Sequence, residues 1–289
     1  MPVSHAKGVP QLARRELLFA LLAASGARAS AQQTQPGSPP YIEGGTIIVA
    51  ACSRERIVIA ADSKASFRAD GFQDEVCKLA NPASKLIYAA SGLAGVGDWS
   101  AADEARGVAS RIVGDNPYLS ASTLGSVAEA WARAMAAKMR TMPSSVFARD
   151  RTESHTTALF AGLDRADTVN LVKAIVQPVA AAGGKMDART SVAPLEIPAS
   201  GTRFLAFGMP AIAMEFLARK TPRAKAEVEQ WPRYFAGSAD LGESIAIRLV
   251  ELTSYFETRQ DLVGGATAAI RMDGRSGVRW LHRPPACLR

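Results

Sequence analysis

The chain contains 289 residues, of which 48% are hydrophobic, 21% charged and 7% aromatic, and it carries a net charge of +7. This is the composition of an ordinary globular protein, which excludes a wholly disordered chain, and three cysteines are too few to staple a disulfide scaffold of this length. No run of about eighteen apolar residues is present, so we expect no stable membrane anchor, and basic residues do not gather with aromatic ones, so we expect no nucleic-acid partner.

Residues 1–31 have the pattern of a secretory signal peptide. Arg14 and Arg15 precede a short apolar run, and Ala29-Ser30-Ala31 supplies the small residues at which a signal peptidase cuts. We therefore expect the protein to be exported, either to the periplasm or out of the cell. The arginine pair fits the twin-arginine route, and an ordinary Sec signal that contains two arginines remains the alternative.

Residues 32–45 are rich in proline, glycine and glutamine and contain too little apolar surface to build a packed core. We interpret them as a linker or propeptide. The folded part of the chain is then expected to be one domain over residues 46–289, beginning near Thr46.

The first elements of this domain are predicted to be a hairpin. Two apolar, β-rich runs, Thr46–Cys52 and Ile57–Ala61, flank a polar turn at 53–56. A third strand is expected over Lys85–Ser91, where the apolar pattern runs into a glycine-rich stretch.

Helices and further strands follow. Asp98 is expected to cap a helix over 99–113, and Ser120 or Ser122 is expected to begin a longer helix that reaches Arg140. The remaining expected elements are strands at 156–162, 169–176 and 202–207, helices at 210–219 and 239–258, and a terminal hairpin over 265–272 and 278–281. This grouped order favours a layered fold of mixed α and β structure over strictly alternating units.

Four residues are spaced in a way that carries chemical meaning. Asp62 follows Thr46 by sixteen residues, Lys78 by thirty-two and Gly92 by forty-six. Together with the preceding Gly-Gly pair and the segment Ala61-Asp62-Ser63-Lys64-Ala65-Ser66, this pattern resembles the N-terminal-nucleophile (Ntn) hydrolases, specifically proteasome β-type subunits and their bacterial two-component relatives. Taken singly, each residue has an ordinary structural interpretation, such as a turn at Asp62 or a solvated surface lysine at Lys78.

The resemblance implies an α+β fold, a four-layer αββα sandwich in which two antiparallel sheets lie between layers of helices. It also assigns roles to a set of residues: Thr46 as nucleophile, Gly45 before it as the self-cleavage junction, Asp62 and Lys78 as catalytic partners, Gly92 as oxyanion donor, and Ser66 as substrate-binding residue. No cofactor is implied.

Chemistry explains why these residue types are needed. A threonine hydroxyl is a poor nucleophile unless a base accepts its proton, and the free amine of an N-terminal threonine can be that base. A nearby Lys78 ammonium would lower the pKa of that amine by like-charge repulsion, and Asp62 would pair with Lys78 and orient it. The Gly92 N–H would stabilise the oxyanion, an effect of about 3–4 kcal/mol in comparable sites.

Three positions depart from the family pattern. Met209 stands where the family has a serine that supports the amine, and it cannot donate the same hydrogen bond. Gln260 and Val263 replace an aspartate and a serine of a later motif, unless Asp261 substitutes through a one-residue shift. The bacterial relatives also lack parts of this set.

Histidines and cysteines add little to the site. His155 and His282 have no acidic or cysteine partners at metal-ligand spacing, so no metal site is expected. Cys52 and Cys77 lie near the proposed active strands, either as a disulfide or as two buried thiols, and Cys287 is expected to be unpaired in both cases.

The sequence therefore predicts an exported threonine-type amide hydrolase that acts on peptides. One alternative is an inactive proteasome-like subunit with an assembly or binding role, which the three departures favour. Another is an amidase of the same superfamily that acts on small molecules. The expected partner is a peptide or amide substrate, and the resemblance leaves a homo-oligomeric ring open as the assembly.

Overall fold

The computed structural model describes residues 41–44, 46–67, 71–73, 76–96, 99–142, 155–181, 186–258 and 263–288. All of them belong to one unit, Pro39–Arg289. The predicted signal peptide at 1–31, most of the predicted linker or propeptide, and Gly45 lie outside the described residues.

A five-stranded antiparallel sheet is built around the predicted first hairpin. Its strands lie in the order β12-β2-β3-β13-β14, which are Arg203–Gly208, Ile47–Ser53, Arg56–Ala61, Ala268–Asp273 and Gly277–His282. β2 and β3 are buried almost throughout because both faces of this sheet are covered, so their sequences read as continuous apolar runs.

The second sheet contains nine described strands and is also antiparallel. Its main order is β11-β10-β9-β7-β1-β4-β5, with β6 and β8 also paired to β7. The strands, in chain order, are β1 Tyr41–Gly44, β4 Ala65–Phe67, β5 Gly71–Gln73, β6 Leu79–Ala83, β7 Leu86–Val96, β8 Trp99–Ser100, β9 Thr156–Leu163, β10 Val169–Ala180 and β11 Met186–Pro194.

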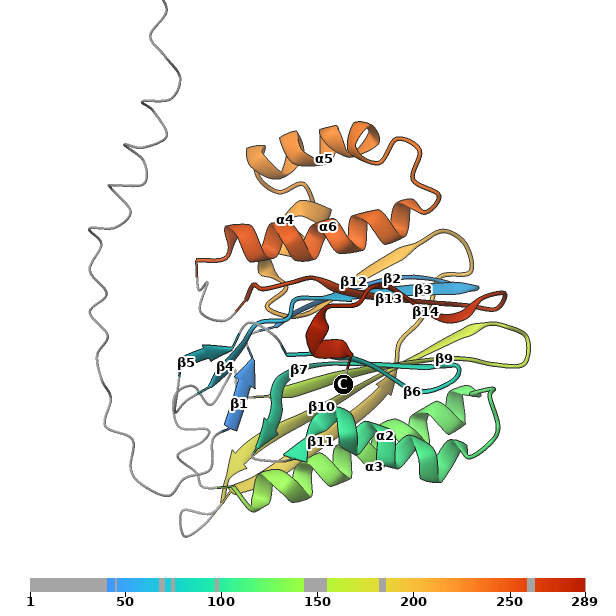
Figure 1. Ribbon diagram of the computed structural model, residues 1–289, viewed down its shortest axis with the longest axis vertical. Helices are drawn as coiled ribbons and strands as arrows, with labels where there is room; N and C mark the ends of the chain where they lie inside the picture. The colour runs from blue at the N-terminus through green and yellow to red at the C-terminus, as the bar shows by residue number, and fades with distance from the viewer. Residues whose placement is uncertain are drawn as a thin grey trace, which may run out of the picture. The chain divides into compact units, whose positions relative to one another are not determined.

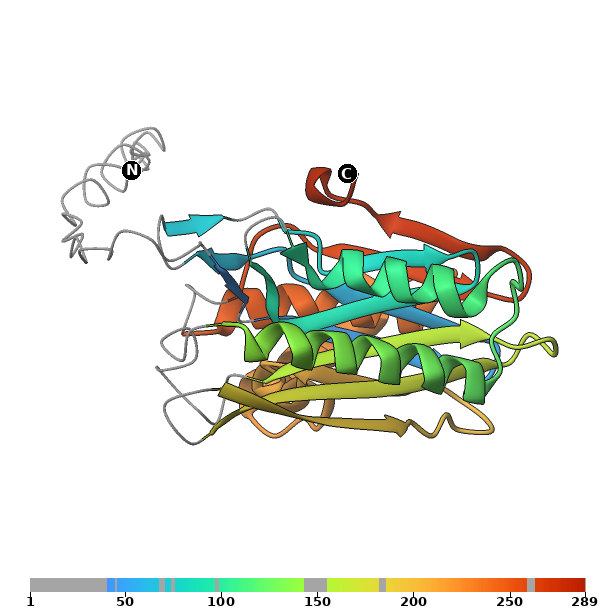
Figure 2. The ribbon, with the colours of Figure 1, turned by 90° about the horizontal axis from the view of Figure 1, so that it is seen from below.

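Five α-helices in the described part of the chain cover the outer faces of the sheets (Figure 1). α2 (Ala101–Val113) and α3 (Ala121–Arg140) lie side by side on the nine-stranded sheet, as Figure 2 shows from below. α4 (Ala211–Leu217), α5 (Pro222–Tyr234) and α6 (Leu241–Phe256) lie on the side of the five-stranded sheet. None of the described helices is long and apolar enough to span a membrane.

Strand alternation divides the apolar side chains among three cores. In β2, Ile48 and Ala50 face the other sheet, whereas Ile47 and Val49 face α4–α6. The third core lies between the nine-stranded sheet and α2 and α3, where Trp131 packs edge-on against Phe160 and donates from Nε1 to the carbonyl of Ala101. Helices, sheet, sheet and helices thus form a mixed α+β structure that is compatible with the expected sandwich.

Most of the predicted elements are confirmed, with three differences. Helix α2 is capped by Ser100, whose hydroxyl accepts from the Asp103 N–H, so the prediction of Asp98 as the cap was wrong. The sequence analysis also missed helix α5 and the strands β4, β5, β6, β8 and β11, although Thr221 followed by Pro222 is a recognisable start for α5. β1 lies within the segment interpreted as a linker or propeptide, which therefore contains a paired strand.

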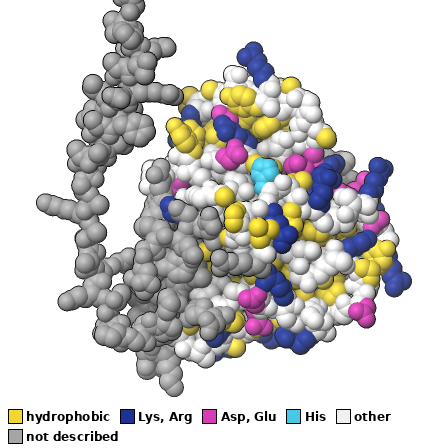
Figure 3. Space-filling view, in the orientation of Figure 1, with side chains coloured by type: hydrophobic (Ala, Val, Ile, Leu, Met, Phe, Trp, Pro, Cys, Tyr) yellow, Lys and Arg dark blue, Asp and Glu magenta, His cyan; other side chains and the backbone are white. Residues whose placement is uncertain are grey.

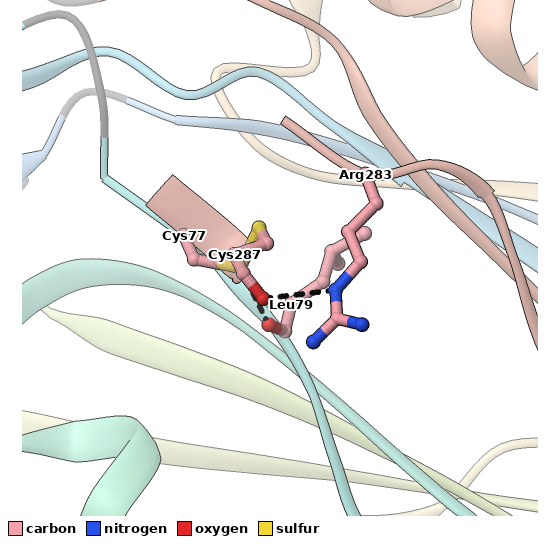
Figure 4. The surroundings of a disulfide bond; sticks show 4 residues. All are labelled: Cys77, Leu79, Arg283 and Cys287. Carbon is pink, nitrogen blue, oxygen red and sulfur yellow. Dashed lines mark hydrogen bonds between the residues drawn. A yellow bond between two sulfur atoms is a disulfide. The ribbon is translucent and has the colours of Figure 1, made fainter. Parts of the chain in front are cut away.

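The cysteine pairing differs from both alternatives considered for the sequence. Cys77 is bonded to Cys287 (Figure 4). Cys52 is the free, buried thiol. The expectation that Cys287 is unpaired was wrong because the C-terminal 3₁₀ turn, η3 (Pro285–Cys287), places the Cys287 side chain in the core between the sheets, beside Cys77. The two cysteines are 210 residues apart, a proximity that spacing along the chain does not reveal.

Charged side chains on the face seen in Figure 1 are spread out, with acidic groups between the lysines and arginines (Figure 3). Many of the described ones form ion pairs on the surface, such as Arg140 with Asp187 at 2.7 Å. Exposed pairs of this kind contribute little to stability, about 0–1 kcal/mol each, so the two sheets and their cores hold the fold.

Candidate active site

Antiparallel pairing of β2 with β3 brings Thr46 and Asp62 to the same end of the five-stranded sheet. Ile48 is opposite Ala61, so Thr46 before β2 and Asp62 after β3 lie at adjacent positions. The Asp62 N–H donates to the carbonyl of Ile47 at 3.3 Å, and the Ile47 N–H donates to Asp62 Oδ1 at 3.0 Å. Asp62 is thus bound to the residue next to Thr46.

Lys78 reaches this position from the other sheet. It immediately precedes β6, and its Nζ lies 3.0 Å from Asp62 Oδ1. Thr46, Asp62 and Lys78 are only 2%, 1% and 5% exposed. The fold therefore brings together three residues that the sequence analysis grouped by spacing, and it buries all of them.

Asp62 is held entirely by hydrogen-bond donors. Oδ1 accepts from Lys78 Nζ and the Ile47 N–H, and Oδ2 accepts from the Gly264 N–H at 3.0 Å. A carboxyl group surrounded by three donors is best satisfied as the carboxylate, because the protonated form would turn a proton toward a donor. Gly264 was not assigned a role from the sequence, since a backbone donor leaves no residue-type signal.

Burial shifts the pKa values of Asp62 and Lys78 in opposite directions. It raises the pKa of the Asp62 carboxyl above its ordinary value, while the Lys78 charge and the Gly264 and Ile47 N–H groups work against that rise. Burial lowers the pKa of the Lys78 ammonium, and the Asp62 charge works against that fall. Each group therefore depends on the other to remain charged inside the protein.

The Thr46 backbone is fixed from β12. Its carbonyl accepts a 2.8 Å hydrogen bond from the Met209 N–H. Gly208, with φ +82°, passes so close that a Cβ on it would lie 1.8 Å from the Thr46 oxygen. Met209, where the family has a serine, thus contributes its backbone to the site, and its side chain packs with the core beneath α4–α6.

Gly92 also occupies a position that excludes a side chain. It lies in β7 with φ +93°, and a Cβ on it would lie 2.5 Å from the carbonyl oxygen of His155. Its partner across the ladder is Gly44 of β1. Gly92 is therefore adjacent to the chain segment that leads into Thr46.

β1 occupies the space between two strands of the nine-stranded sheet. On one side Glu43 pairs with Ser66 of β4, and on the other Glu43 and Gly44 pair with Leu93 and Gly92 of β7. β1 is thus paired along both of its edges. It occupies the backbone groups of β4 and β7 with which an extended peptide could otherwise pair.

Among the other residues singled out from the family pattern, only Val263 has a side chain that the structure describes. Val263 is 1% exposed and packs in the core beneath α4–α6. Gly45, Gln260 and Asp261 lie outside the described residues, and the structure describes the backbone of Ser66 but not its side chain.

Of two cavities in the described residues, one lies beside the site and the other far from it. One, of about 520 Å³, is lined by Lys64, Ser254, Tyr255, Val263 and Gly264, and therefore lies next to the residue that binds Asp62. A second, of about 950 Å³, lies around the β2–β3 turn at 53–56. That turn is about 20 Å along β2 from Thr46, so the second cavity is separate from the site.

Comparison of the chain with models of known protein families and with curated proteins finds no match. The interpretation of the site therefore depends on its own geometry.

We predict that the Lys78–Asp62 pair is strongly coupled. Lys78→Met leaves a buried carboxylate without its counter-charge, and Asp62→Asn leaves a buried ammonium, so each should lower the free energy of unfolding by about 3–5 kcal/mol. The double variant should lose much less than the two losses added together. Urea denaturation at pH 7 measures all three, and strictly additive losses would contradict the coupling.

The pH dependence of Lys78→Met gives a second check. Without Lys78, the pKa of Asp62 in the folded state rises further above its value in the unfolded state. At low pH the carboxyl is protonated in both states, so the variant loses little stability there. As pH rises, the buried carboxyl must ionise without a counter-charge, and the variant loses stability relative to the wild type. The stability difference from wild type should therefore shrink as pH is lowered toward about 4.

We further predict that Gly208 tolerates no side chain. Gly237 is a matched control, since its φ of +83° is nearly that of Gly208 but a Cβ there would meet no atom within 4 Å. Gly237→Ala should cost about 1–2 kcal/mol for its backbone conformation alone. Gly208→Ala should cost about 3 kcal/mol more, and equal melting temperatures for the two variants would contradict the close approach to Thr46.

Proposed function

We propose that this chain is an exported threonine-type amide hydrolase of the Ntn class, which acts on peptides through Thr46 after self-cleavage behind Gly45. The observation that carries the proposal is the buried junction at the start of β2. There one carboxylate, Asp62, binds both Lys78 Nζ and the backbone of the residue that follows Thr46. Two sheets flanked by helices are compatible with the αββα sandwich of that class.

The burial of an ion pair at this place supports a chemical role. Desolvation makes a buried pair weak as a stabilising device, and apolar residues of the same volume are often as good or better. A lysine ammonium held in a dry site does, however, depress the pKa of a neighbouring amine. Lys78 would act in this way on the Thr46 amine, and Asp62 would keep Lys78 charged.

Self-cleavage would proceed by attack of Thr46 Oγ on the carbonyl carbon of Gly45. The C–N bond to Thr46 breaks, its nitrogen takes up the hydroxyl proton, and an ester forms between Gly45 and Thr46 Oγ. Water then hydrolyses that ester and leaves Thr46 with a free amine. Before this step the Thr46 nitrogen is part of a peptide bond and cannot act as a base.

Substrate hydrolysis would repeat the chemistry in two halves. The free amine accepts the Thr46 hydroxyl proton as Oγ attacks the substrate carbonyl, and the Gly92 N–H stabilises the tetrahedral oxyanion. The amine then protonates the leaving nitrogen, and water hydrolyses the acyl-threonine ester. Removal of β1 would leave unpaired edges on β4 and β7, with which an extended substrate could pair.

Export is supported by the Cys77–Cys287 disulfide, because such bonds form and persist in oxidising compartments. It agrees with the signal-peptide pattern of residues 1–31.

A non-catalytic proteasome-like subunit is the second candidate. Met209 favours it, because its side chain cannot support the amine as a serine would. This candidate predicts that the chain before Thr46 is never released.

We predict that the purified, exported protein begins at Thr46 and that Thr46→Ala abolishes this cleavage. Thr46→Ser should still be cleaved, since it retains a hydroxyl. Thr253→Ala is a matched control, because Thr253 is as buried as Thr46 and its hydroxyl donates to the Leu249 carbonyl within α6, away from the site. Intact-mass measurement of the N-terminus checks all three.

Hydrolysis should follow the same pattern on a panel of peptides and small amides, and this panel also separates a peptidase from a small-molecule amidase. A mature chain that begins near residue 32 in wild type and in Thr46→Ala alike would contradict the proposal. It would favour the non-catalytic subunit.

A further inference from the structure

The Lys78–Asp62 contact joins the two sheets. Asp62 follows β3 of the five-stranded sheet, whereas Lys78 precedes β6, which pairs with β7 of the nine-stranded sheet. The distance between Nζ and Oδ1 therefore depends on how the two sheets are held relative to each other at this point.

The Cys77–Cys287 disulfide joins the same two layers one residue away. Cys77 is the neighbour of Lys78, and Cys287 lies in η3, which directly follows the last strand of the five-stranded sheet, β14. Cys287 is 5% exposed and belongs to the core between the sheets. The covalent cross-link and the ion pair thus run in parallel between the layers.

The C-terminal turn that carries Cys287 is a defined anchor. The Cys287 N–H donates to the Pro284 carbonyl at 2.9 Å, and Arg283 Nε donates to the Cys287 carbonyl at 3.0 Å (Figure 4). The Arg283 guanidinium also lies over the Trp280 ring of β14. Cys77 is therefore bonded to a turn that is itself fixed to the sheet.

Hydrogen bonds also hold the backbone around Lys78. The Val76 N–H donates to the Ser63 carbonyl at 2.9 Å, and the Ala90 N–H donates to the Lys78 carbonyl at 3.1 Å. Leu79, the next residue, pairs with Ala89 in the ladder between β6 and β7. Hydrogen bonds of this kind can lengthen, whereas a covalent link at Cys77 limits how far the neighbouring Lys78 can move.

We propose that the Cys77–Cys287 disulfide is a positioning element for the reaction, which holds Lys78 at the distance from Asp62 and Thr46 that the chemistry needs. The inference rests on the proposed function of Thr46. Coulomb interaction falls with distance, and displacement of a catalytic group by about 1 Å can cost a hundredfold in rate. The C-terminal turn, far from Thr46 in the sequence, then contributes to the site through this bond.

The test compares Cys287→Ser with Cys52→Ser. Cys52 is fully buried in the same core between the sheets but is not bonded to the segment that carries Lys78, so its variant reports loss of packing alone. Both are assayed well below their melting temperatures. We expect Cys287→Ser to lower kcat about tenfold, with little change in KM, and Cys52→Ser to keep the wild-type kcat.

The pH profile separates positioning from general loosening of the fold. If Lys78 moves away, the pKa of the Thr46 amine rises, so the acidic limb of kcat/KM should move to higher pH in Cys287→Ser only. In the part of the chain that the structure describes, the other charged side chains that bear on this limb are Asp62 and Lys64, which lies beside Gly264, and both are unchanged in the two variants. Identical limbs in wild type and Cys287→Ser would overturn the proposal.

A measurement that needs no enzymatic activity tests the positioning role separately from the proposed function. NMR titration of Lys78 Nζ in the isotope-labelled full chain should show a changed pKa in Cys287→Ser and the wild-type value in Cys52→Ser. If wild type hydrolyses nothing, the proposed function fails, while an unchanged Lys78 pKa would overturn the positioning role. The Cys77→Ala/Cys287→Ala double variant, which leaves no lone thiol, replaces Cys287→Ser if the latter does not fold.

Discussion

A buried lysine and a buried aspartate meet between the two sheets, and the arrangement of the site depends on that contact. Removing either charge from water is costly, so each group is tolerable only while the other is present. Asp62 offsets part of this cost by accepting from two backbone N–H groups in addition to Lys78. These bonds also tie together the start of β2, the end of β3 and the loop at Gly264, which places Thr46 at a fixed position.

Several close backbone approaches make room for this junction. Gly208 and Gly92 both have positive φ angles and both lie where a side chain would strike a carbonyl oxygen, of Thr46 in one case and His155 in the other. Glycine is required at such positions by space as well as by backbone conformation. The site therefore depends on glycine at these two positions as well as on its charged side chains.

β1 gives the proposed reaction an order of events. While it lies between β4 and β7, the edges of both strands are occupied and the Thr46 nitrogen is a peptide nitrogen. Self-cleavage would create the amine base, and departure of β1 would then free those edges. The disulfide at Cys77, next to Lys78, links this region to the C-terminal turn. Segments from both ends of the folded chain, β1 and the C-terminal turn, are therefore connected to the region of the site.

The sequence by itself determined the local elements and the grouping of the site. Two continuous apolar, β-rich runs predicted the hairpin of β2 and β3, and a polar cap and periodic apolar residues predicted α3. These helices and strands depend on nearby residues and can therefore be read along the chain. Asp62 and Lys78 were singled out differently, because their spacing of sixteen and thirty-two residues from Thr46 resembles that of a known family.

Only the tertiary structure decided the rest. The pairing of Cys77 with Cys287, the bond from Gly264 to Asp62 and the seating of β1 join segments distant in sequence. Any residue except proline can supply a backbone donor, so such donors leave no signal in the sequence. The spacing of cysteines does not reveal which segments of the chain meet in space. Such contacts depend on how the sheets stack, and local patterns along the chain do not specify that stacking.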